Sequence, residues 1–276
     1  MGLRIHWHFV ITPSLPIGRR LKQNTAMFNI PTVQKPAVQS LSQDGLSLLT
    51  PENFTSTLKL SADWATRWVK LAESWHNLPP DAHLKDGGSY RRRRHACFVQ
   101  NMAANTLTQT PHRAHWQPTD YNALHGGFER WFEPVEDAVA NASAWTDLLA
   151  GFGNLFAQVQ PVDQWFVEAH QFRIDTAGGV GRPTPEGAHR DGVNFVVVLL
   201  VKRYGVKGGE TRVFDANGPQ GVRFLMLEPI TALLLDDARV IHETTPIFPD
   251  HGDGEKGYRD TLVLTYRAGG FQAPLS

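Results

Sequence analysis

The stretch that decides the fold reads PEGAHRDG over residues 185–192, and the apolar run NFVVVLLV over residues 194–201 follows it. The apolar run predicts a buried strand, and the polar stretch stands where that strand begins. His189 and Asp191 are two residues apart, so on extended backbone their side chains leave the same face. An imidazole and a carboxylate placed in this way lie close enough to share one metal ion.

A third ligand would complete a facial set, and His242 is the best candidate because it stands at the end of another apolar run. Two histidines and one carboxylate on one face, with the opposite face open, are typical of non-haem Fe(II) oxygenases. The same three ligands can also hold zinc for hydrolysis. The three residues taken alone leave both chemistries open.

The order of predicted elements indicates the fold class. From residue 165 onward, short strands are separated by Gly- or Pro-rich turns, with no long helix between them. The predicted strands are 166–175, 194–201, 212–214, 223–227, 232–235, 239–243 and 261–267. Ahead of them, 134–156 reads as a helix, and another helix is predicted from the spacing of Trp64, Trp68, Leu71 and Trp75. We therefore expect an α+β protein whose core is a double-stranded β-helix (jelly-roll, cupin-like) with an N-terminal helical layer.

Residues 1–45 show no clear hydrophobic period and are interrupted by several prolines. This predicts a loosely ordered N-terminal extension over 1–45, followed by a single functional domain over 46–276.

Composition narrows the function classes. Lys+Arg and Asp+Glu are equal at 27 each, so no net field attracts nucleic acid or an anionic membrane surface. Cys97 is the only cysteine, which excludes an intrachain disulfide and a Cys-rich zinc site. No apolar run approaches the ~20 residues that a membrane helix needs. We expect a cytoplasmic protein with neither nucleic acid nor membrane as a partner.

Several further segments resemble the Fe(II)/2-oxoglutarate-dependent dioxygenases, and they look most like the bacterial family that contains L-isoleucine 4-hydroxylase and other free-amino-acid hydroxylases. The resemblance spans roughly residues 54–270, and its matching segments are 170–173, 185–197, 208–214, 236–242 and 257–264. It implies that His189, Asp191 and His242 are both the metal ligands and the catalytic residues. It also implies Fe(II) as the metal, 2-oxoglutarate as cosubstrate, O2 as oxidant and ascorbate as the reductant used in vitro.

A fixed cation is needed for the distal carboxylate of 2-oxoglutarate, and Arg259 is the expected anchor because a guanidinium can bind a carboxylate with two hydrogen bonds. Thr261 shares its face and can donate a second hydrogen bond, whereas Asp260 lies on the opposite face. Arg267 is the alternative anchor. The resemblance also implies that Thr211, within a Gly-Gly-Glu-Thr segment, contacts the cosubstrate.

The resemblance implies hydroxylation of a small molecule, with a free aliphatic L-amino acid as the expected substrate. Related halogenases lack the ligand carboxylate, so the presence of Asp191 favours hydroxylation over halogenation. An inward-facing arginine could bind the substrate carboxylate, and the candidates are Arg91–Arg94, Arg130 and Arg173. The alternative is a non-catalytic jelly-roll protein that binds a ligand or metal in regulation or stress signalling. The sequence leaves open the substrate, the position and stereochemistry of its hydroxylation, and the oligomeric state.

Overall fold

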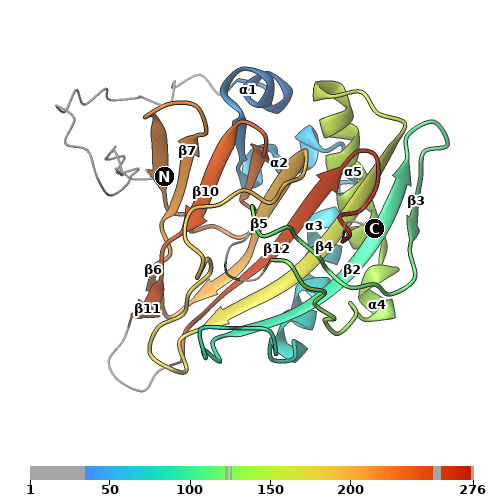
Figure 1. Ribbon diagram of the computed structural model, residues 1–276. Coiled ribbons are helices and arrows are strands. Elements are labelled where there is room, and N and C mark those ends of the chain that lie inside the picture. Colours follow the sequence, from blue (N-terminus) through green and yellow to red (C-terminus); the bar gives the residue numbers. More distant parts are fainter. Residues whose placement is uncertain (1–34, 122–123, 125, 251–255, 275–276) are drawn as a thin grey trace, which may run out of the picture.

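A computed structural model describes residues 35–121, 124, 126–250 and 256–274. Its largest element is an antiparallel sheet of seven strands in the order β1-β9-β5-β12-β4-β2-β3 (Figure 1). The strands are β1 (Leu46–Leu49), β2 (Arg91–Asn101), β3 (Thr106–Gln109), β4 (Gln164–Asp175), β5 (Phe195–Tyr204), β9 (Ala232–Asp236) and β12 (Tyr258–Arg267). The long strands β2, β4, β12 and β5 form its centre, and they supply one wall of the site described below.

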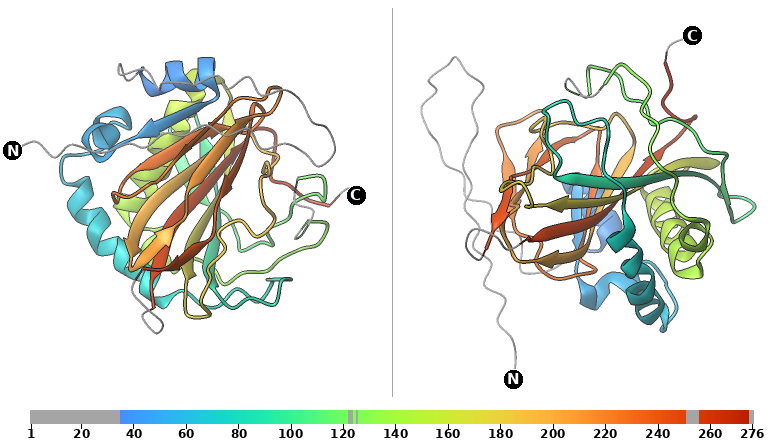
Figure 2. Two further views of the ribbon diagram at one scale, coloured as in Figure 1. Left: turned by 90° about the vertical axis from the view of Figure 1, so that its left-hand side faces the viewer. Right: turned by 90° about the horizontal axis from the view of Figure 1, so that it is seen from below.

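Two smaller antiparallel sheets face this large sheet (Figure 2). One contains β10 (Val240–Thr244), β7 (Thr211–Asp215) and β8 (Gly221–Phe224), and the other pairs β11 (Ile247–Pro249) with β6 (Val206–Gly208). Apolar side chains from the large sheet and from the β10-β7-β8 sheet fill part of the space between them, namely Val196, Leu200, Val213, Phe224, Leu233, Leu235 and Val240. Two antiparallel layers closed over a shared core confirm the predicted α+β jelly-roll.

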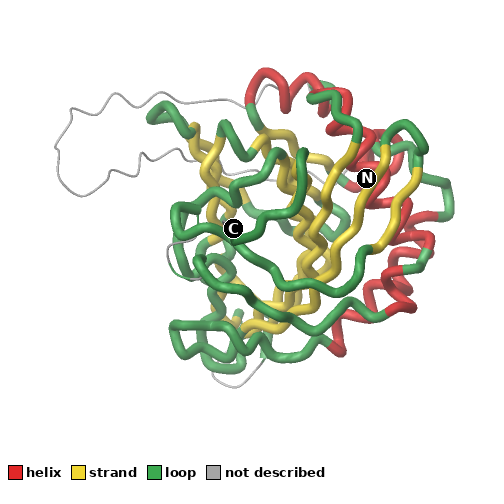
Figure 3. The backbone as a smooth tube through the Cα atoms, turned by 45° about the vertical axis from the view of Figure 1, so that its right-hand side comes forward, coloured by secondary structure: helices red, strands yellow, loops and turns green. Residues whose placement is uncertain are grey.

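Helices cover the outer face of the large sheet (Figures 2 and 3). They are α1 (Ala37–Asp44), α2 (Pro51–Thr57), α3 (Trp64–Ala72), the 3-10 helix η1 (Glu73–Asn77), α4 (Asp137–Ala140) and α5 (Ser143–Val159). The predicted tryptophan stripe is confirmed, because Trp64 and Trp68 stack at 5.3 Å and the Trp75 indole donates to the carbonyl of Thr261 at 3.2 Å. The helical layer thereby supports β12 from behind. Within the described part of the chain, no helix is long and apolar enough to cross a bilayer.

The expected loose extension over 1–45 lies largely outside the described residues, which begin at 35. Its last part forms α1, where Leu41 is fully buried. The side chain of Arg239 donates to the carbonyls of Leu41, Ser42 and Gln43 in the last turn of this helix, where the Leu41 carbonyl also accepts from the backbone N–H of Gly45. The folded domain therefore includes residues ahead of the expected boundary at 46.

Candidate active site

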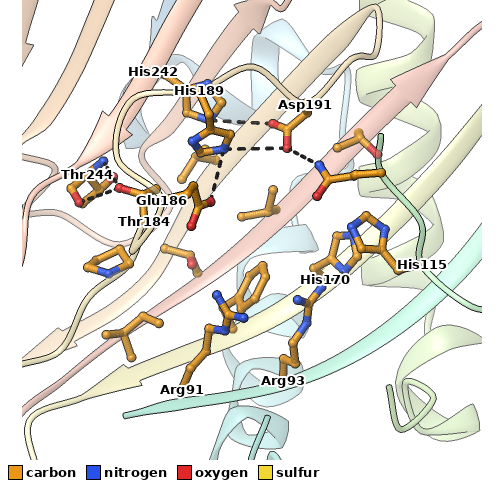
Figure 4. A pocket seen from close by; sticks show the side chains of 18 of the residues that line it. Arg91, Arg93, His115, His170, Thr184, Glu186, His189, Asp191, His242 and Thr244 are labelled. Carbon is orange, nitrogen blue, oxygen red and sulfur yellow. Dashed lines mark hydrogen bonds and ion pairs between the residues drawn. The ribbon is translucent and has the colours of Figure 1, made fainter. Parts of the chain in front are cut away.

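A cavity of about 120 Å³ lies between the large sheet and the segment that carries residues 183–191 together with β10 (Figure 4). Both polar and apolar side chains face it. The lining residues are Arg91, Arg93, His115, Gln117, Arg130, His170, Phe172, Ile174, Pro183, Thr184, Glu186, His189, Asp191, Val198, His242, Thr244, Arg259, Thr261, Val263 and Thr265.

The structure brings His189, Asp191 and His242 together at one end of this cavity. His189 and His242 form an isolated antiparallel bridge, with backbone N–H···O distances of 3.0 and 2.9 Å. The Nε2 atoms of His189 and His242 lie 3.9 and 3.8 Å from the two carboxylate oxygens of Asp191. Both separations are shorter than twice a metal–ligand bond of about 2.0–2.2 Å, so these ligand atoms can reach one common ion. His189 and Asp191 do not lie on a regular strand, as expected from their spacing, but in the loop that precedes β5.

Electrostatics keep one of these imidazoles ready to act as a ligand. Burial and the neighbouring His189 lower the pKa of His242 to about 3, so its ring is neutral near pH 7. For His189, burial lowers the pKa, but the carboxylates of Asp191 and Glu186 outweigh that effect and raise it. The two carboxylates thus favour positive charge at the position of His189.

Asp237 fixes the loop that carries Asp191. Its fully buried carboxylate accepts hydrogen bonds from the backbone N–H groups of Asp191 (3.0 Å), Gly192 (2.7 Å) and Val193 (3.1 Å). Gly192 has φ +76°, and a Cβ there would lie 2.6 Å from the ring of Tyr121, so only glycine suits the turn. The position of the Asp191 carboxylate, a candidate metal ligand, is therefore determined by a residue 46 positions away in the sequence.

Arg259 and Thr261 lie on the same wall, on β12, and both are almost fully buried. The Nε and Nη2 atoms of Arg259 have no hydrogen-bond partner among the described residues. Burial, together with the nearby Arg203, lowers the pKa of Arg259 to about 10, which still leaves it charged at neutral pH. An unpaired buried guanidinium is costly unless an anion completes the site, so this wall fits a bound carboxylate. Arg267 bonds instead to the carbonyl of Gly270 and does not line the cavity.

Thr211 lies beside the cavity without lining it. It is buried on β7, opposite Thr244 of β10, and its hydroxyl has no partner in the part of the chain that the structure describes. Thr244 faces the cavity. The contact between Thr211 and a cosubstrate therefore stays a prediction.

The candidate arginines separate into two groups. Arg91, Arg93 and Arg130 line the cavity and are buried. The guanidinium of Arg93 lies between the rings of Phe132 and Phe172, at 3.6 and 4.4 Å from their centroids. The others point away from the cavity into ion pairs: Arg92 with Asp175, Arg94 with Glu136, and Arg173 with Asp260.

Sequence reasoning missed a second buried cluster beside the cavity, formed by His95, His115, Glu168 and His170. Glu168 accepts hydrogen bonds from His115 Nδ1 (2.6 Å) and His95 Nε2 (3.0 Å). Arg93 donates to Nδ1 of His170 at 2.6 Å, which leaves the proton of that neutral ring on Nε2. These are hydrogen-bond distances, and a protonated Nε2 cannot be a ligand, so the cluster is a network that fixes imidazole tautomers.

Glu186, His115 and Gln117 also line the cavity and were missed from the sequence. Glu186 lies next to His189, with its Oε2 buried and unpaired among the described residues (Figure 4). In the sequence, the only signal for Glu186 was its place in the 185–192 stretch beside the two candidate ligands, His189 and Asp191.

Comparisons with known proteins agree with this geometry. A model of the 2OG-Fe dioxygenase family matches residues 72–265. The structure of a bsmA homolog from Methylobium petroleophilum PM1 is 54% identical, with a TM-score of 0.81 over 87% of this chain and 94% of that one. IDO from Bacillus thuringiensis (17% identity, TM-score 0.69, 85% and 98% of the two chains) shares the fold. So does the Fe(II)/(alpha)ketoglutarate-dependent dioxygenase TqaL (19%, 0.63, 84% and 85%). Among curated protein sequences, no match was found.

Proposed function

The chain belongs to the 2OG-Fe dioxygenase family, and from this premise we propose that it hydroxylates a free L-amino acid or a similar small metabolite. The observation that carries the cosubstrate assignment is Arg259, a buried guanidinium on the wall next to the His/Asp/His set, with two nitrogens that have no partner among the described residues. In this proposal His189, Asp191 and His242 hold Fe(II) and act in catalysis.

Iron bound there supplies the oxidising chemistry, in which O2 converts 2-oxoglutarate to succinate and CO2 and one oxygen atom enters a C–H bond of the substrate. Arg259 binds the distal carboxylate of 2-oxoglutarate, and the Thr261 hydroxyl on the same face donates to it. Many of the side chains that line the cavity are buried and fixed in place, so they can hold the reactants in one orientation. Asp191 occupies the position that a halide would need, which favours hydroxylation.

The end of the cavity that is lined by Arg91, Arg93 and Arg130, here called the substrate end, fits a molecule that carries both a carboxylate and an ammonium group. Arg91, Arg93 and Arg130 each have a buried nitrogen without a partner among the described residues, and each can bind a carboxylate. The unpaired Oε2 of Glu186, between them and the metal ligands, can accept from an ammonium group (Figure 4). A free amino acid carries both groups, and Phe172 and Ile174 offer apolar contact to an aliphatic side chain. The resemblance to L-isoleucine 4-hydroxylase points to the same class.

The experiment is a succinate assay with Fe(II), 2-oxoglutarate and ascorbate across the twenty L-amino acids, with product mass measured. We expect one or a few amino acids to stimulate succinate release and to gain the mass of one oxygen atom. Succinate release that no amino acid stimulates would overturn the substrate assignment. No release at all, with iron bound, would instead favour a non-catalytic binding protein.

A further inference from the structure

Gln117 lies between the substrate end and the metal end of the cavity. It belongs to a short segment that runs antiparallel to the one carrying Arg130, since His115 and Arg130 exchange backbone hydrogen bonds of 2.9 and 3.0 Å. The backbone carbonyl of Gln117 accepts from the N–H of Gly127 at 2.8 Å. Gln117 is 5% exposed, so the surrounding structure fixes its side chain.

Two hydrogen bonds connect Arg130 to Asp191 through this amide. Arg130 Nη2 donates to Gln117 Oε1 at 2.8 Å, and Gln117 Nε2 donates to Asp191 Oδ1 at 3.0 Å. A guanidinium has donors only, so the amide oxygen must face Arg130. The amide NH2 group must then face Asp191. The orientation of the amide therefore follows from its partners.

The same contact distinguishes the two oxygens of Asp191. Each oxygen lies near one histidine, Oδ1 at 3.9 Å from His189 Nε2 and Oδ2 at 3.8 Å from His242 Nε2, but only Oδ1 accepts a hydrogen bond from the amide of Gln117. A carboxylate that binds metal through one oxygen leaves three positions of an octahedron free beside the two histidines. One that binds through both oxygens leaves only two, too few for a bidentate 2-oxoacid and O2.

We propose that Gln117 is a positioning residue that holds Asp191 as a one-oxygen ligand, and that Arg130 acts through Gln117 by fixing the amide. The proposal rests on the metal assignment in the proposed function. It adds a physical connection between an arginine at the substrate end and the metal ligand, with no direct contact between Arg130 and the metal.

The direction in which metal affinity changes when Arg130 is removed distinguishes two ways in which this residue could act. A cation near a metal site repels the metal, so removal of Arg130 would tighten metal binding if the residue acted by its charge alone. If it acts by orienting Gln117, its removal weakens metal binding, because partners of a ligand typically account for 10–100-fold in metal affinity.

The test is calorimetric titration of the metal-free full chain with Co²⁺, for wild type, Gln117→Met, Arg130→Met and the double variant. Gln171→Met is the matched control, because that buried amide donates to Ser74 and does not line the cavity. His242→Ala, which should abolish the binding, assigns the signal to this site. Thermal unfolding confirms that each variant is folded.

We expect about 10-fold or weaker Co²⁺ binding for each single variant. The double variant should bind no more weakly than Gln117→Met, since both act through one contact. The visible spectrum of bound Co²⁺ should also change in Gln117→Met and not in Gln171→Met. Wild-type affinity in Gln117→Met, or tighter binding in Arg130→Met, overturns the proposal. If Gln117→Met does not fold, Arg130→Met decides alone. Failure of the wild type to bind Co²⁺ would overturn the metal assignment itself.

Discussion

Arg259 and Asp260 are adjacent on β12, yet their side chains leave opposite faces of the large sheet. The guanidinium of Arg259 lies in the cavity with two nitrogens unpaired among the described residues, whereas Asp260 is held by Arg173 through two contacts of 2.7 Å. The alternation of the strand thus prevents the nearest carboxylate from neutralising Arg259. An anion from outside the chain is the natural partner of this cation.

Replacing Arg259 by leucine should raise the half-saturation concentration of 2-oxoglutarate at least ~10-fold, because hydrogen bonds to charged groups contribute about 1.5–3 kcal/mol. Arg259→Lys should recover part of the loss, since an ammonium cannot form the two-pronged contact. Arg267→Leu is the matched control, because that arginine lies on the same strand outside the cavity. Half-saturation measured by succinate release decides, and equal values for wild type and Arg259→Leu would remove Arg259 as the anchor.

Asp237→Ala should destabilise the fold and weaken metal binding together. Three backbone N–H groups around Asp191 would lose their shared charged acceptor, at a cost of about 3 kcal/mol or more. Urea unfolding and Co²⁺ titration measure the two effects. The control is Asp215→Ala, where an exposed carboxylate accepts from the N–H of Asn217 and the expected change is about 0.5 kcal/mol or less. A stable Asp237→Ala variant with unchanged metal affinity would contradict the role given to this carboxylate.

The elements that could be predicted from the sequence are those specified by local pattern. The apolar runs of β5 and β9 and the tryptophan stripe of α3 are local signals, and the structure confirms them. Strands β6 and β11, of three residues each, are too short to show a period. The His189/Asp191 pair was recognisable from its spacing even though it lies in a loop.

The sequence could not show which of the four consecutive arginines, 91–94, point into the cavity. Alternate side chains of a strand share a face, so either Arg91 and Arg93 or the other two could point inward. The choice depends on the register of β2 with β4, in which Arg91 pairs with Ile174 and Arg93 with Phe172, two residues that also line the cavity. The contacts of Glu168 and Gln117 could not be predicted either, because they also depend on how distant segments pack. Their partners come from distant segments, so no local pattern indicates them.

If Arg93 binds the carboxylate of the proposed amino acid substrate, Arg93→Met should raise the KM for that substrate by about 10-fold or more and leave the KM for 2-oxoglutarate nearly unchanged. Methionine keeps much of the packing between Phe132 and Phe172 but cannot bind a carboxylate. Arg92→Met is the control, because that side chain points to the other face of β2. Steady-state kinetics with the amino acid identified by the succinate assay provide the measurement. A rise confined to the 2-oxoglutarate KM would place Arg93 at the wrong end of the cavity.

The His115–Glu168 pair predicts an acid-sensitive fold. Burial lowers the pKa of His115 to about 4 in spite of the neighbouring Glu168 carboxylate, whereas an unfolded histidine titrates near 6.5. Between these two pH values the unfolded chain binds a proton at this histidine that the folded chain does not. The contribution of neutral His115 to the free energy of unfolding is therefore complete above pH ~6.5 and is lost as the pH falls towards ~4. The shift corresponds to at most about 3 kcal/mol. Urea unfolding of the metal-free protein at several values from pH 7 to 4 measures it. His115→Gln should flatten that pH dependence. Parallel profiles for wild type and His115→Gln would show that this imidazole is not the group that destabilises the fold in acid.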